Sequence, residues 1–171
     1  MLFRSWALAG GGVLWAMMRV SLRRLRSFAR YFWLFSVALM LLPFVPGIGV
    51  SVRGARAWVG LGPIVFQPSE FLKLGVLLVV ADLIARREAR MGELSQVLVP
   101  SLLVIGFGAG LMILQNDLGS AIVLSAIGIA VLFLGGAPLV PVAGISIALS
   151  GAAVGFALSA PYRRDRKSTR L

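Results

Sequence analysis

The chain has 171 residues, of which 59% are hydrophobic and 13% are charged, and its formal net charge is +11. Ordinary globular domains carry about 25% charged residues, so this composition argues against a typical soluble domain. The sequence contains no cysteine and no histidine. This excludes disulfides and thiolate chemistry, and it removes the commonest general base and the commonest metal ligand.

The positive residues stand in short clusters between apolar runs of near-spanning length. This distribution is typical of topology signals in helical membrane proteins. We therefore expect contact with membrane lipid and no nucleic-acid partner.

A first apolar run covers residues 2–18, and a second helix is predicted over residues 31–48. Between them lies a basic segment, residues 19–30, which we predict to be a cytoplasmic loop. Topology and headgroup contact account for its charge, and a lipid-specific site is the sharper alternative. The arginines of this segment are Arg19, Arg23, Arg24, Arg26 and Arg30.

A loop rich in glycine and proline is predicted over residues 49–67, followed by a helix over residues 68–85. The residues from Gln67 to Glu70 indicate a helix start, with proline in the first turn and an acid near the positive end of the helix dipole. A second basic segment, residues 86–93, is also predicted to be cytoplasmic.

Three further apolar helices complete the prediction, over residues 95–114, 120–134 and 139–160. In the first of them, Gly106, Gly108 and Gly110 are predicted to allow close packing. The sequence thus predicts an all-α, polytopic helical membrane protein with about six transmembrane helices. If the chain starts outside, both basic segments lie inside, and the loop at 49–67 shares the outer side with the helix break at 115–119.

Polar groups are costly inside a membrane, so those on the outer side are expected to serve a function. They form a candidate cavity or substrate-binding set: Arg56, Trp58, Gln67, Ser69, Glu70, Lys73, Gln115 and Asp117.

Several of these residues have a structural alternative. Glu70 and Lys73 are three residues apart and can form a buried ion pair that orients two helices. In a polar cavity, Arg56 and Lys73 would instead offset the charge of a pyrophosphate. Trp58 is either an aromatic of the membrane interface or a platform for a sugar or lipid.

Asp117 stands at a helix break and is predicted to cap the next helix, a role that does not exclude facing the cavity. Gln115 and Asn116 are expected to satisfy backbone groups that the break leaves free. Asp82 and Arg86, four residues apart, are predicted to form a structural pair.

The last seven residues, DRKSTRL from Asp165 to Leu171, turn sharply polar after an apolar run. They read like the in-frame translation of a sequencing adapter. We therefore expect residues 165–171 to be non-native and the natural sequence to stop near Arg164.

The motifs GARAWVGLGPIVFQPSEFLKL, ADLIARRE and QNDLGSAIVL resemble those of the SEDS family of cell-wall glycosyltransferases, the FtsW and RodA proteins. The similarity runs from about Leu22 to Arg164. Three positions depart from the family's pattern: Ala57 replaces its usual second arginine, Asn116 a proline and Ser120 a threonine.

The resemblance implies a fold of about ten membrane helices, of which this chain offers about six. We therefore expect residues 1–164 to form one incomplete transmembrane domain, from roughly the second to the seventh helix. The outer loop that carries the family's catalytic acid would then lie outside it. No catalytic residue is expected in this chain, and the fragment is expected to be inactive alone.

For the whole protein, the resemblance implies a peptidoglycan glycosyltransferase that polymerises lipid II on the outer face of the bacterial cytoplasmic membrane. Its donor is a glycan on undecaprenyl pyrophosphate, and its implied partner is a class B penicillin-binding protein, the transpeptidase. A role in division or elongation and the need for a cofactor such as a divalent cation are left open. The alternatives are a flippase for lipid-linked precursors and a structural membrane subunit that recruits partners.

Overall fold

The computed structural model describes residues 2–52, 54–62, 64–86, 94–137 and 144. The predicted helix at 139–160 therefore lies outside the described residues except for Gly144, and the tail at 165–171 lies outside them entirely. The described helices are α1 (Leu2–Met18), α2 (Leu22–Leu39), the 3-10 turn η1 (Leu42–Phe44), α3 (Pro68–Arg86), α4 (Leu94–Leu114) and α5 (Leu118–Leu134).

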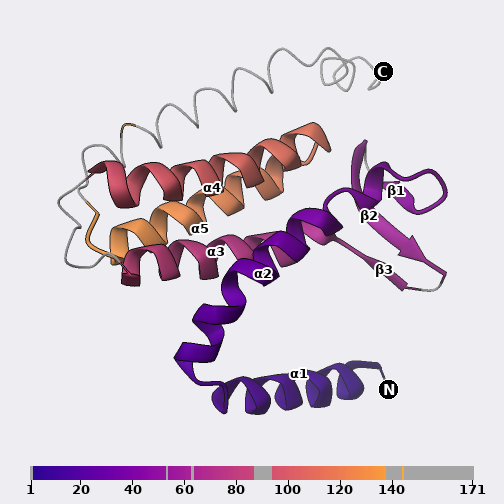
Figure 1. Cartoon of the computed structure of the whole chain (residues 1–171). Coiled ribbons are helices and arrows are strands. Elements are labelled where there is room, and N and C mark those ends of the chain that lie inside the picture. The colour runs from indigo at the N-terminus through magenta and orange to yellow at the C-terminus, as the bar shows by residue number, and fades with distance from the viewer. Residues whose placement is uncertain (1, 53, 63, 87–93, 138–143, 145–171) are drawn as a thin grey trace, which may run out of the picture.

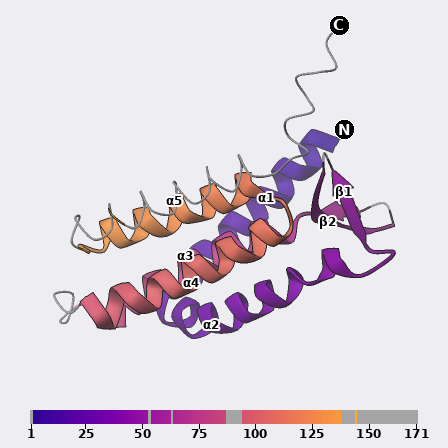
Figure 2. The same cartoon turned by 90° about the horizontal axis from the view of Figure 1, so that it is seen from above.

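Helices α3, α4 and α5 pack on one another, and α2 crosses α3 (Figures 1 and 2). Their shared core is aliphatic and sulfur-containing rather than aromatic, which suits close helix packing. Its fully buried members are Met40, Leu72, Val76, Val80, Met112, Leu124 and Leu132. Residues 10–18 of α1 are exposed along their whole length.

A small antiparallel sheet occupies the segment predicted as a loop, so the loop prediction for residues 49–67 is wrong. Its strands are β1 (Gly49–Val52), β2 (Ala55–Leu61) and β3 (Ile64–Phe66), in the order β1-β2-β3. Gly54 and Gly62 have φ of 85° and 62° at the two connections, a conformation that only glycine adopts at no steric cost. Two of the glycines that suggested a loop therefore mark the two turns of a sheet.

Helix α2 begins at Leu22, whereas the sequence predicts a helix from residue 31. Most of the predicted basic loop is therefore helical, because residues 19–30 contain neither glycine nor proline and are rich in arginine and leucine, which are good helix formers. Arg23, Arg24, Arg26 and Arg30 thus lie on α2.

The sheet lies at one end of the bundle, where α2 ends, α3 begins and α4 turns into α5 (Figure 1). At the opposite end, Arg26 of α2 lies 3.8 Å from Asp82 of α3, measured from Nε to Oδ1. Asp82 also accepts a 2.7 Å hydrogen bond from Arg86, which confirms that predicted pair. The grouping of residues 49–67 with the helix break at one end, and of basic residues at the other, is therefore confirmed for the described residues.

By length and composition, two of the described helices could cross a membrane, namely Leu22–Phe44 and Gln96–Leu114. Leu118–Leu134 is apolar but shorter. The predicted count of six spanning helices stays a prediction.

Two glycines allow the close approach of α4 and α5. A Cβ atom on Gly108 would lie 2.8 Å from Leu124 Cδ2, and one on Gly128 would lie 2.5 Å from both Cγ1 and Cδ1 of Ile105. A Cβ atom on Gly106 or Gly110, by contrast, would meet no neighbouring heavy atom within 4 Å among the described residues, so the packing role predicted for these two does not hold here.

Replacing Gly128 with alanine should lower the free energy of unfolding by about 1–3 kcal/mol, because the new methyl group overpacks against Ile105. Thermal unfolding in detergent measures the effect, with Gly106→Ala as the matched control. The control should be neutral or stabilising, because alanine favours the helix by up to about 1 kcal/mol. Equal stability of the two variants would contradict the packing described here.

Candidate functional site

The break between α4 and α5 is a helix C-cap followed directly by a helix N-cap. Asn116 has a φ of 59°, its N–H donates to the Ile113 carbonyl at 2.9 Å, and the Asp117 N–H donates to the Met112 carbonyl at 2.9 Å. This pattern is a Schellman motif with Asn116 in the left-handed position. A proline could neither adopt this φ nor donate the bond, so this end of α4 requires a residue other than proline at position 116.

Asp117 uses both carboxylate oxygens. Its Oδ1 accepts a 3.1 Å hydrogen bond from the Ser120 N–H, which confirms the predicted capping of α5. Its Oδ2 accepts a 2.7 Å hydrogen bond from Nε2 of Gln67, the residue just before α3, and the same Nε2 lies 3.3 Å from the Ser120 hydroxyl. The starts of α3 and α5 are therefore tied together through side chains.

Gln115 joins the break to two further segments. Its buried side chain donates from Nε2 to the Met40 carbonyl at the end of α2, at 2.7 Å. Its own carbonyl accepts a 3.0 Å hydrogen bond from the Arg56 N–H of β2. The Gln115 side chain therefore satisfies a backbone group of a distant segment and not, as the sequence predicts, one that the break leaves free. We call Gln67, Gln115, Asp117 and Ser120 the polar junction.

Glu70 and Lys73 form an ion pair on the first turns of α3, with Lys73 Nζ 2.7 Å from Glu70 Oε1. The Glu70 side chain is 59% exposed and that of Lys73 is 15% exposed. The alternative of a buried pair that orients two helices is therefore wrong, because both residues lie on one helix and Glu70 is open to its surroundings. An exposed pair of this kind contributes about 0–1 kcal/mol, so stability alone gives little reason for these charges.

Strand β2 places its side chains on alternating faces. Ala57 and Val59 are fully buried, whereas Arg56 is exposed and Trp58 is half-buried. Within the described residues, the Arg56 guanidinium forms no ion pair. This strand therefore presents a cation beside the polar junction, to which its backbone is bonded.

Not every residue of the predicted set belongs to the polar junction. Ser69 is buried, and its hydroxyl has no hydrogen-bond partner among the residues described. Ser120, missing from the predicted set, is part of the junction, and its place three residues after a capping aspartate is the signal that could have found it.

No group of three or more His, Cys, Asp or Glu side chains in the described part of the chain could hold a metal ion.

A double-mutant cycle on the free energy of unfolding tests the polar junction, using Gln67→Ala, Asp117→Ala and the double variant. We expect a coupling of about 1–3 kcal/mol, because a hydrogen bond to a charged, partly buried group is stronger than a neutral one.

The control cycle uses Asp82→Ala and Arg86→Ala. Because the Arg86 side chain is exposed, this cycle should give a coupling below about 1 kcal/mol. Additive effects of the Gln67 and Asp117 variants would show that the two residues are not joined as described.

The sequence of this chain is similar to those of known proteins. A family model described as a cell cycle protein family, FtsW/RodA/SpoVE, matches residues 4–169. A probable peptidoglycan glycosyltransferase FtsW of Aromatoleum aromaticum is 37% identical over 157 residues, which cover 88% of this chain and 37% of that protein. The FtsW of Nitrosococcus halophilus is 38% identical over 139 residues, covering 81% of this chain and 35% of its own.

Two solved structures are also similar to this chain. The rod shape determining protein RodA of Thermus thermophilus matches with a TM-score of 0.68 and 34% identity, over 87% of this chain and 49% of that one. A chain from a peptidoglycan synthase complex that coordinates polymerization and crosslinking matches with a TM-score of 0.64 and 34% identity, over 96% of this chain and 49% of its own.

The chain thus spans little more than a third of the length of these FtsW relatives. The predicted resemblance and the predicted class of helical membrane protein are both confirmed. The chain belongs to the FtsW/RodA/SpoVE family.

Proposed function

We propose that the whole protein is a peptidoglycan glycosyltransferase that polymerises lipid II on the outer face of the bacterial cytoplasmic membrane, during division or elongation. The relatives named as probable peptidoglycan glycosyltransferases support this reaction. The observation that carries it is the polar junction at the sheet end of the bundle, beside Glu70 and Lys73.

The proposed reaction transfers a glycan from undecaprenyl pyrophosphate to a sugar hydroxyl of the next lipid II. The hydroxyl oxygen forms a bond to the anomeric carbon, the bond to the pyrophosphate oxygen breaks, and the hydroxyl proton passes to a base. Negative charge develops on the leaving pyrophosphate, and positioned cations stabilise it. Arg56 and Lys73 are the cations we assign to this role, with Trp58 at the mouth of the cavity.

The general base is placed outside these residues in our proposal. Both oxygens of Asp117 accept hydrogen bonds and Glu70 bonds Lys73, so we assign both carboxylates a supporting role and not that of the base. The polar junction instead ties the starts of α3 and α5 together beside these cations. Because the chain spans only 37% of one FtsW relative, we also propose that residues 1–164 alone do not polymerise lipid II.

A class B penicillin-binding protein is the proposed partner. Support comes from the similarity to a chain of a complex that coordinates polymerization and crosslinking, since crosslinking is the work of a transpeptidase.

Lipid II polymerisation by the whole protein, followed by gel separation of the glycan products, tests the proposal. Arg56→Gln and Lys73→Gln should each lower the rate at least about tenfold, because each removes a group that stabilises charge in the transition state. Arg30→Gln is the matched control, since it removes the same charge from an exposed position on α2 away from the polar junction.

Full activity of both cavity variants would show that these cations do not face the substrate. Movement of lipid II across the membrane without any glycan product would favour a flippase instead. A whole protein that recruits its partner but gives neither glycan product nor transport would favour a structural subunit.

A further inference from the structure

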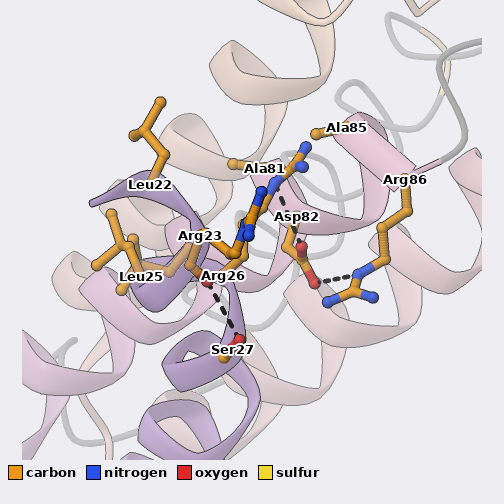
Figure 3. A pocket seen from close by; sticks show the side chains of 10 residues that line it. Leu22, Arg23, Leu25, Arg26, Ser27, Ala81, Asp82, Ala85 and Arg86 are labelled. Atoms are coloured by element: carbon orange, nitrogen blue, oxygen red, sulfur yellow. Dashed lines mark hydrogen bonds and ion pairs between the residues drawn. The ribbon is translucent and has the colours of Figure 1, made fainter. Parts of the chain in front are cut away.

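A second polar site lies at the opposite end of the bundle from the polar junction. It is a cavity of about 690 Å³ between the start of α2 and the end of α3 (Figure 3). Its polar lining consists of Arg23, Arg26, Ser27, Asp82 and Arg86. We call it the basic pocket.

The basic pocket carries more positive than negative charge. Three arginines face one aspartate, which gives 3 − 1 = +2 among its lining residues. Asp82, whose side chain is 14% exposed, bonds Arg86 at 2.7 Å and lies 3.8 Å from Nε of Arg26. Within the described residues, Arg23 forms no ion pair, and Asp82 Oδ1 accepts no hydrogen bond. Asp82 therefore holds two guanidinium groups in place without neutralising the pocket.

An apolar cavity of about 700 Å³ adjoins the basic pocket. Leu25, Ser27 and Leu78 line both cavities, so the two lie next to each other. Phe28 and Tyr31 of α2 line the apolar cavity and are 54% and 70% exposed. A cationic pocket thus lies directly beside an apolar groove at the surface.

We infer that these two cavities together bind an anionic glycerophospholipid of the cytoplasmic leaflet. The phosphate would lie among Arg23 and Arg26, because arginine forms strong bidentate hydrogen bonds with phosphate. An acyl chain would fill the groove beside Phe28 and Leu78. The excess of arginine places this end of the bundle at the cytoplasmic surface, where anionic headgroups gather.

The groove distinguishes a lipid from a free phosphate ion. A soluble phosphate would satisfy the arginines and leave the exposed aromatic lining uncovered, whereas a lipid covers both surfaces at once. This site is separate from the polar junction, and it does not depend on the reaction proposed above.

Native mass spectrometry of the whole protein in detergent, with added phosphatidylglycerol or phosphatidylcholine of the same acyl chains, tests the inference. The double variant Arg23→Gln/Arg26→Gln should lower retained phosphatidylglycerol about tenfold or more, because each cation near an anionic headgroup contributes to binding. The matched control Arg19→Gln/Arg30→Gln removes the same charge from the same segment outside both cavities and should retain phosphatidylglycerol within about twofold of the unchanged protein.

A second arm separates headgroup from acyl chain. Leu78→Trp places a larger side chain at a position that lines both cavities, at unchanged charge, and it should also reduce phosphatidylglycerol retention. Inorganic phosphate at the same concentration should not displace the lipid. Equal retention by the two double variants, equal retention of phosphatidylcholine, or displacement by inorganic phosphate would each overturn the inference.

Discussion

The break between α4 and α5 is the constraint on which the sheet end of the molecule depends. A helix that stops inside an apolar environment leaves backbone groups that need partners, since water is scarce there. Here Asn116 closes α4, Asp117 opens α5, and the Gln115 carbonyl accepts from β2. The sheet is therefore part of the solution to the break, because its second strand supplies one of the missing donors.

Side chains extend this local solution into a three-dimensional one. Gln67 uses the carboxylate of Asp117 to tie α3 to α5, and Gln115 ties the end of α2 to the same place. Loss of Gln115 would leave the Met40 carbonyl without this donor, at a cost of about 1–3 kcal/mol for a buried group. The Arg56 backbone is bonded to Gln115, and Lys73 pairs with Glu70 on the first turns of α3. Both cations thus lie at the sheet end of the bundle, where our proposal places the charged leaving group.

Local sequence spacing was enough to predict the contacts between near neighbours. The Asp117 cap and the Asp82–Arg86 pair follow from residues three and four apart, and charge clusters predicted which segments share an end. The bond from Gln67 to Asp117 joins residues 50 positions apart, and no local rule reports such a distance. The sheet is hard to predict because its strands are short and its glycine turns resemble a loop. The charge rule alone places the start of α2 too late, because arginine signals topology and also favours a helix.

The most direct test of the polar junction and its sidedness is thiol crosslinking in whole cells. These 171 residues contain no cysteine, so Arg56→Cys and Asn116→Cys would be the only thiols in this part of the whole protein. Both positions are exposed. The Arg56 N–H donates a 3.0 Å hydrogen bond to the Gln115 carbonyl, and Asn116 directly follows Gln115. A short bismaleimide should join them, and a membrane-impermeant thiol reagent added outside should block the reaction. No crosslink above that of Arg56→Cys paired with Arg24→Cys, or a crosslink that the outside reagent cannot block, would contradict the account.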